Sequence, residues 1–153
     1  MPQLTIEGLR KIKEETASQM ALREGRPEGG GTIRHHLLIC AGLACITCGS
    51  LKVRERLEKE LKDRGLENKV KVVITGCAGL CAEGPLMLVY PEGTFYRKLT
   101  PEDVSLIVEE HILKGKPVEK LFYRDPTRKV AIPRMKDIPF FGNQHLRVLR
   151  NQG

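Results

Sequence analysis

The sequence has no tryptophan, and aromatic residues make up only 5% of its 153 residues. No apolar run approaches the roughly 18 residues that a membrane-spanning helix requires, so we expect no membrane insertion. The N-terminal stretch MPQLTIEGLRKIKEE is charged and has no apolar segment, which argues against a secretory signal. The glycine-rich G-x-G-x-x-G pattern of dinucleotide-binding loops is also missing.

The net charge of +7 is unevenly distributed along the chain. Residues 116–153 carry nine basic and three acidic side chains, so this segment accounts for +6 of the total. A basic segment can bind nucleic acid, anionic lipid or an acidic protein surface. The middle of the chain is close to neutral, and no aromatic ladder alternates with the basic residues. We therefore expect no nucleic-acid binding.

Five cysteines form an odd number, and no export signal accompanies them. A disulfide framework is therefore a poor interpretation. Metal or redox chemistry in a reducing cytoplasm is a better one.

Hydrophobic periodicity and turn residues predict an alternation of helices and strands. A helix over 4–24 carries a narrow apolar stripe and ends at the glycine-rich joint GRPEGGG. Ser50 is a candidate cap for the helix that follows the first strand, and Gly65 ends that helix. Thr100 is a candidate cap for the last helix. We expect strands at 33–39, 69–75, 86–90 and 94–99, and helices at 4–24, 51–64 and between 100 and 115.

The core order β-α-β-β-β-α predicts an α/β fold: a two-layer, thioredoxin-like domain in which helices pack on a four-stranded sheet. An N-terminal helix and an extended C-terminal tail flank this domain. We divide the chain into a helix and glycine-rich linker (1–31), the thioredoxin-like domain (32–115) and a basic connector (116–153). The connector shows little periodicity, and we expect it to run over a surface that belongs to this domain or to a partner. Its Phe140 and Phe141 are equally interpretable as a docking anchor or as part of a satellite core.

All five cysteines lie in two glycine-rich loops, each of which follows a predicted strand. The first loop holds Cys40, Cys45 and Cys48, and the second holds Cys77 and Cys81. Loops that follow strands of one sheet can meet at one edge, and glycine lets the backbone approach bound sulfur closely.

Four kinds of site are compatible with this cysteine pattern. Two local pairs, Cys40-x4-Cys45 and Cys77-x3-Cys81, would hold a [2Fe–2S] cluster. The plant-type ferredoxin spacing is also present, with Cys48 in place of Cys81. Cys45-x2-Cys48 has the spacing of a thioredoxin-like dithiol, and four thiolates would equally suit a structural zinc. The two-pair set is favoured because the plant-type set leaves Cys81 unexplained and does not suit a βαβ setting. His35 and His36 are strand residues expected to face opposite sides, not ligands.

These segments resemble a known family. ICAGLACITCGS, TGCAGLCAEGP, YPEGTFYRKLTPEDV and IVEEHILKGKPVEKL are similar to the thioredoxin-like [2Fe–2S] ferredoxins. The similarity is greatest to the domain at the N-terminus of the NADH-binding flavoprotein subunit of complex I-like dehydrogenases and NAD-linked or electron-bifurcating hydrogenases. The resemblance assigns the cluster ligands to Cys40, Cys45, Cys77 and Cys81, and it leaves Cys48 as a spare thiol. In such folds a cis-proline often lies near the position of Pro85.

The resemblance implies one-electron transfer to or from a flavin or Fe–S partner within an NAD(H)-linked complex. The expected cofactor is a [2Fe–2S] cluster, and the expected partners are flavin- and NADH-binding and Fe–S subunits. A homodimer is a further candidate assembly. The tail resembles the connector that leads into a flavin domain, so we expect either a fragment or a subunit that docks on a separate flavoprotein. Without a nucleotide-binding loop, this chain alone is not expected to turn over NADH. A thiol–disulfide oxidoreductase and a zinc-stabilised adaptor remain the alternative functions.

Overall fold

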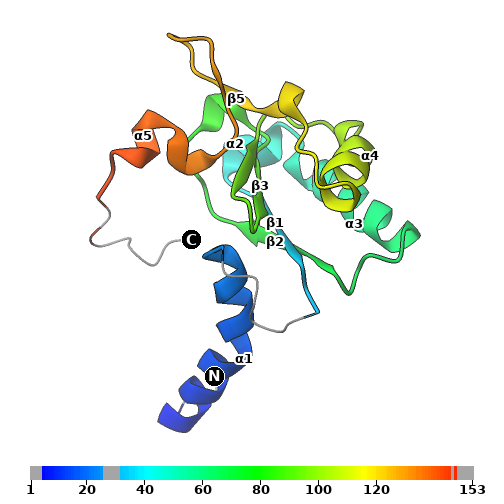
Figure 1. The fold of residues 1–153 in the computed structure, drawn as a ribbon, viewed down its shortest axis with the longest axis vertical. Coiled ribbons are helices and arrows are strands. Elements are labelled where there is room, and N and C mark those ends of the chain that lie inside the picture. Colours follow the sequence, from blue (N-terminus) through cyan, green and yellow to red (C-terminus); the bar gives the residue numbers. More distant parts are fainter. Residues whose placement is uncertain (1–4, 26–31, 146, 148–153) are drawn as a thin grey trace.

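The computed structural model describes residues 5–25, 32–145 and 147, and its centre is a four-stranded sheet (Figure 1). Residues 1–4, residues 26–31 of the predicted glycine-rich joint, and residues 146 and 148–153 of the predicted connector lie outside the described residues. Among the described residues, no helix is both long enough and apolar enough to cross a membrane.

The sheet has the strand order β2-β1-β3-β4. β1 pairs in parallel with β2, whereas β1–β3 and β3–β4 are antiparallel pairs. Helix α3 connects the parallel strands, as a βαβ unit requires. The predicted α/β, thioredoxin-like order is therefore confirmed. The strands are β1 (His35–Cys40), β2 (Val70–Thr75), β3 (Met87–Tyr90) and β4 (Thr94–Tyr96).

Helices cover one face of this sheet. These are α3 (Ser50–Asp63) and α4 (Asp103–Leu106), which continues directly as the π-helix η2 (Ile107–Leu113) (Figure 1). Alternate strand residues point to this face, because side chains of a strand alternate between the two sides of a sheet. Leu37 and Ile39 thus pack in the main core with Leu57 of α3, whereas Cys40 belongs to a second apolar cluster.

The ends of two helices differ in detail from the sequence prediction. Gly49, with φ at +96°, is the N-terminal cap of α3, and Ser50 is its first residue, fully buried with an unpaired hydroxyl. The prediction of Ser50 as the cap was wrong, because only a residue that tolerates positive φ fits there. Gly65 ends α3 as predicted. Thr100 does not accept a capping bond; its hydroxyl and backbone N–H both donate to the Asp103 carboxylate.

The N-terminal helix α1 (Ile6–Arg23) meets the sheet only near its last turn (Figure 1). Leu22 is buried, and Arg23 Nε donates to Nδ1 of buried His36 over 3.2 Å. Burial, followed by the charges of Arg23 and Lys71, lowers the pKa of His36 to about 4. The predicted helix is confirmed, but its apolar stripe is solvent-exposed, with Leu9 51% exposed.

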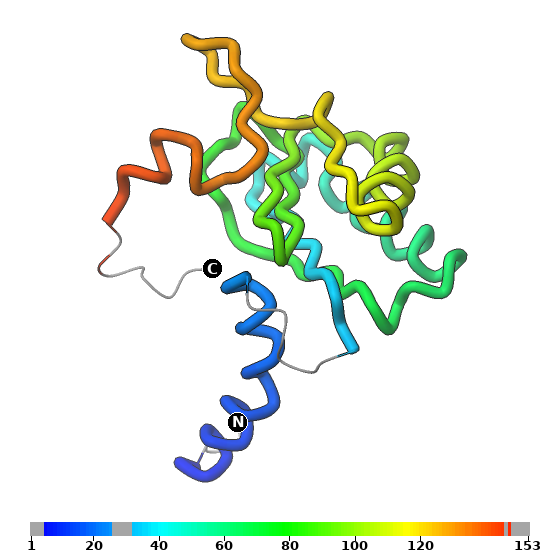
Figure 2. Tube along the Cα trace, in the orientation of Figure 1, coloured from blue at the N-terminus to red at the C-terminus, as the bar shows by residue number. Residues whose placement is uncertain are grey.

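The C-terminal segment packs on this domain as far as α5. Val118, Leu121 and Phe122 join the main core, and Ile138 is buried in the second cluster. Figure 2 shows this segment leaving η2, crossing the sheet and returning along its other side. The segment contains η3 (Glu119–Leu121), β5 (Tyr123–Arg124), β6 (Ala131–Ile132), η4 (Met135–Asp137) and α5 (Pro139–Gly142). The division at residue 115 stays a prediction, and the packing described here crosses it.

The surface crossed by this segment is the domain's own. Isolated bridges join Tyr96 to Phe122 and Thr94 to Arg134, both from β4. Phe141 packs against the second cluster, whereas Phe140 is 61% exposed. Phe141 therefore belongs to a satellite core. The role of the exposed Phe140 as a docking anchor stays a prediction.

A buried hydrogen-bond chain fastens the C-terminal segment to β4 and η2. The hydroxyl of Tyr96 accepts from the backbone N–H of Val118 over 2.9 Å and lies 2.8 Å from Nδ1 of His111. Since the hydroxyl already accepts one bond, its own proton is free to go to the imidazole nitrogen. Burial lowers the pKa of His111, which favours the neutral acceptor form.

We predict that Tyr96→Phe destabilises the domain by about 1–3 kcal/mol, because it leaves the Val118 N–H and His111 Nδ1 unpaired in the core. The free energy of unfolding in urea measures this loss. Tyr123→Phe is the matched control, since no hydrogen bond of the Tyr123 hydroxyl is present among the described residues. Equal stability of the two variants would refute the prediction.

Candidate metal centre

The pairing of β1 with β2 brings the two cysteine loops together. In the parallel register Cys40, the last residue of β1, is opposite Thr75, the last residue of β2. Parallel strands end at the same edge of a sheet, so the loops that follow them start side by side. Cys77 follows β2 by two residues, and all five cysteines are free thiols.

The first loop is not the irregular segment that the sequence predicted. It contains a short helix, α2 (Leu43–Thr47), which begins after Gly42 and carries Cys45 into the interior. Cys40 and Cys45 are 3% and 1% exposed, and they pack with Leu86, Phe95 and Ile138. Ile138 was not predicted to be part of this enclosure, because an isolated isoleucine in the segment from Pro133 to Pro139 shows no hydrophobic periodicity.

The second loop exposes its two cysteines. The thiols of Cys77 and Cys81 lie 3.7 Å apart, and Cys81 begins the 3-10 helix η1 (Cys81–Glu83). The backbone N–H of Gly79 donates to the Cys77 sulfur over 3.3 Å. Gly79 has φ at +86°, a backbone conformation that residues other than glycine rarely adopt. The Gly84–Pro85 peptide bond that follows is cis, at the position singled out in the sequence.

The environment of the thiols differs between the two loops. Burial, followed by the interaction with the Cys40 thiol, raises the pKa of Cys45 to about 12. The Gly79 N–H lowers the pKa of Cys77, because it stabilises the thiolate. The hydrogen bond with Cys77 raises the pKa of Cys81.

These interactions connect four of the five thiols. The Cys40 thiol lies close enough to those of Cys45 and Cys77 to shift their pKa values, and the Cys77 thiol contacts that of Cys81, so the set spans both loops. Cys48, at the C-terminal end of α2, is exposed and takes part in none of these contacts. Within the described part of the chain, no three metal-binding side chains converge on one ion position.

Two glycines allow the close packing around the sulfurs. A Cβ at Gly84 would lie 2.8 Å from the Cys45 sulfur, nearer than real Cβ atoms approach. A Cβ at Gly42 would lie 3.0 Å from the Cys77 Cβ and 3.2 Å from its sulfur, so Gly42 sets the spacing between the loops. A protein-bound iron–sulfur cluster needs thiolate ligands and is tuned by N–H groups that donate to sulfur. The four linked thiols, the Gly79 N–H and the close-packed glycines supply these features here.

Comparison with known proteins places the chain in a family. The family model for the thioredoxin-like [2Fe-2S] ferredoxin matches residues 26–111. A 2Fe-2S ferredoxin of Clostridium pasteurianum is 38% identical over 96 residues, which cover 58% of this chain and 94% of that protein. A 2Fe-2S ferredoxin of Aquifex aeolicus is 40% identical over 79 residues, covering 51% of this chain and 71% of that one.

Solved structures agree with the fold. The thioredoxin-like [2Fe-2S] ferredoxin of Aquifex aeolicus superposes with a TM-score of 0.54 at 33% identity, over 57% of this chain and 93% of that chain. A chain of an NAD+-reducing [NiFe]-hydrogenase gives a TM-score of 0.48 at 16% identity, which is too distant to bear on function. The family model spans more than half of this chain, and the Clostridium ferredoxin is matched over nearly its whole length. The chain therefore belongs to the thioredoxin-like [2Fe-2S] ferredoxins.

Proposed function

We propose that Cys40, Cys45, Cys77 and Cys81 hold the [2Fe–2S] cluster of an electron-transfer module in an NAD(H)-linked redox complex. The observation that carries the ligand set is the proximity of these four thiols at one sheet edge: Cys77 contacts Cys81, Cys40 and Cys45 share one buried cluster, and the Cys40 thiol affects the pKa values of Cys45 and Cys77. The family is that of the [2Fe-2S] ferredoxins. When bound, the cluster supplies a site that accepts and releases one electron at a time.

The protein makes the two halves of this site unequal. Cys40 and Cys45 are closed off by Leu86, Phe95 and Ile138, whereas Cys77 and Cys81 are exposed. A partner can therefore approach from the second loop. The Gly79 N–H stabilises negative charge on the Cys77 sulfur, which is one means by which a protein tunes a cluster potential.

The alternative dithiol function is disfavoured by the environment of Cys45. A thiol–disulfide oxidoreductase needs an accessible attacking thiol with a lowered pKa. Cys45 is 1% exposed, and burial raises its pKa to about 12. Cys48 is exposed, but its partner Cys45 is enclosed and so is poorly placed to resolve a mixed disulfide formed on Cys48.

Assignment to an NAD(H)-linked complex rests on the sequence resemblance to dehydrogenase and hydrogenase subunits. The basic segment 116–153 supports docking on a flavin- or Fe–S-containing partner. In this proposal the chain works in the cytoplasm and carries electrons without turning over NADH alone. A homodimer is one assembly in which it would do so.

The cofactor is tested by anaerobic purification followed by assays of iron, acid-labile sulfide and zinc on one sample. We expect about two irons and two sulfides per chain and a visible absorption that bleaches on reduction. One zinc per chain in a colourless protein would favour the adaptor function instead. A metal-free protein that cannot be reconstituted would favour the dithiol function.

The ligand set is tested with a pair of serine variants. Cys81→Ser is expected to lose most of its bound iron and sulfide, because it removes one of the four linked thiols. Cys48→Ser should keep the iron, sulfide and visible spectrum of the unchanged protein, since Cys48 lies outside the linked set. The opposite result would establish the plant-type set that includes Cys48.

Close packing at the site is tested by Gly84→Ala. The added Cβ would press on the Cys45 sulfur, and overpacking of this kind costs about 1–3 kcal/mol. We expect lower iron content and faster loss of colour in air. Gly76→Ala, in the same loop, is the matched control because nothing lies within 4 Å of its added Cβ. Equal iron content in the two variants would show that the approach of Gly84 to Cys45 is unimportant.

A further inference from the structure

The hairpin of β5 and β6 is a preformed basic projection. Tyr123 pairs with Ile132 and Arg124 with Ala131, and residues 126–130 between the strands are exposed. The Asp125 carboxylate accepts from the backbone N–H groups of Thr127 and Arg128 over 2.8 and 2.9 Å. These bonds fix the turn, so a partner meets the hairpin without first having to order it.

The three cations of the hairpin are available to a partner. Arg124, Arg128 and Lys129 are exposed, and none of them forms an ion pair with another described residue. The carboxylate of Asp125, in the turn itself, accepts two backbone bonds, and these bonds and the charge of Arg128 lower its pKa. Two other arginines differ from the hairpin cations because each forms an ion pair: Arg97 with Glu83, and Arg134 with Asp137.

Two sets of contacts join the base of the hairpin to the cysteine loops. Tyr123 and Ile132 pack against the apolar cluster that contains Cys40 and Cys45. The Arg97 guanidinium lies 5.8 Å from the centre of the Tyr123 ring and pairs with Glu83. Glu83 ends the short helix η1, which begins at the proposed ligand Cys81.

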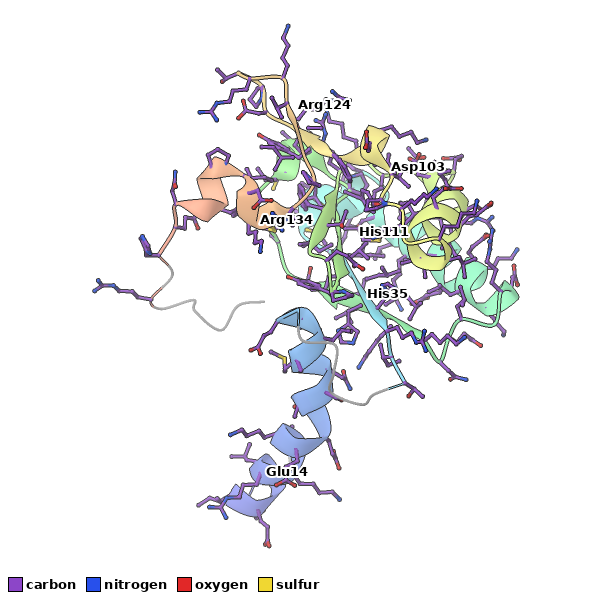
Figure 3. All side chains as sticks on the ribbon, viewed as in Figure 1. Glu14, His35, Asp103, His111, Arg124 and Arg134 are labelled. Carbon is purple, nitrogen blue, oxygen red and sulfur yellow. The ribbon has the colours of Figure 1, made fainter. Side chains whose placement is uncertain are left out.

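Figures 1 and 3 show at which end of the domain the hairpin lies. The hairpin projects from the end of the molecule at which α2 also lies (Figure 1), and Arg124 is at that end, remote from His35 at the other end of β1 (Figure 3). The basic projection thus stands at the cysteine end of the domain.

Apolar side chains are exposed on both elements at this end. Leu43 and Ile46 of α2 are 83% and 38% exposed and are spaced i, i+3, so they share one helix face. Val130 of the hairpin is 57% exposed. Exposed apolar residues accompanied by charges on one surface are typical of a protein-binding surface.

We propose that the β5–β6 hairpin and the exposed face of α2 form the docking surface for the acidic face of a one-electron partner protein. The proposal rests on the proposed function, because the partner must approach the cysteine end to exchange an electron with the cluster. The hairpin cations attract and orient the partner, and Leu43 and Ile46 supply apolar contact at closest approach. Electrostatic steering of this kind acts mainly on the association rate and weakens with salt.

The test uses the full chain with its cluster reconstituted and reduced, and two redox proteins of opposite charge as probes. Oxidised plastocyanin presents an acidic face, and oxidised cytochrome c presents a basic one. In each reaction one electron leaves the reduced cluster and reduces the copper or the haem iron. Stopped-flow absorbance gives the second-order rate constant at low and at high ionic strength.

The hairpin variant carries Arg124→Glu, Arg128→Glu and Lys129→Glu. At low ionic strength we expect it to reduce plastocyanin at least about tenfold more slowly than the unchanged chain and to reduce cytochrome c faster. High salt should remove most of both differences. Leu43→Gln should slow the plastocyanin reaction without changing its salt dependence, since it alters apolar contact only.

The matched control changes the same amount of charge at the opposite end of the domain. Lys59→Glu, Lys62→Glu and Lys69→Glu alter three exposed lysines on α3 and just before β2, at the end of the sheet away from the cysteines. We expect this control to change the plastocyanin rate much less than the hairpin variant does. Iron and sulfide are measured on the unchanged chain and on every variant. Absence of the cluster from the unchanged chain would contradict the proposed function, whereas a slow rate in a variant with full iron and sulfide is loss of steering.

Three results would overturn the docking surface while leaving the electron carrier intact. The first is equal rates for the hairpin and control variants, which would show that only net charge matters. The second is a plastocyanin rate that rises with salt. The third is unchanged plastocyanin kinetics together with lost binding to phosphatidylserine vesicles in the hairpin variant, which would assign the hairpin to a lipid surface.

Discussion

The pairing of β1 with β2 is the constraint on which the site depends. Each strand delivers a cysteine loop, and the parallel register sets Cys40 opposite Thr75, so both loops leave the sheet at one edge. Helix α3 makes this register possible, because parallel neighbours need a crossover connection. Leu57 and its neighbours on α3 pack on Leu37 and Ile39 of β1, so the main core stabilises the strand that ends at Cys40.

The opposite face of the sheet is completed by the C-terminal segment. Ile138 closes the cluster that buries Cys40 and Cys45, and Tyr123 and Ile132 pack against the same cluster. Burial of one thiol pair and exposure of the other give the site a protected side and an accessible side. The segment that closes the protected side also carries the basic hairpin, so enclosure of the cysteines and the charge beside them come from one stretch of chain.

Much of this arrangement was predictable from local patterns. The β-branched run before the second loop, the apolar face of α3 and the Pro-Glu-Gly turn predicted strands and helices in the order β-α-β-β-β-α along the chain, because each is a short-range signal with one dominant structural outcome. Cap positions were less predictable. Gly49 caps α3 where Ser50 was expected, because the backbone leaves α2 through a positive φ. The helix α2 itself was missed, since Leu43–Thr47 is too short to show a period.

By itself, the sequence determined the elements, the two glycine-rich cysteine loops and the family resemblance, because these depend on residue type and spacing. It left Cys48 and Cys81 as rival members of the thiol set. Only the tertiary structure placed the Cys81 thiol against that of Cys77 and left Cys48 exposed outside the set, since these positions depend on how each loop folds and not on cysteine spacing. It likewise decided that residues 118–138 pack on this domain, because an aperiodic segment finds its place through contacts with strands far away in the chain.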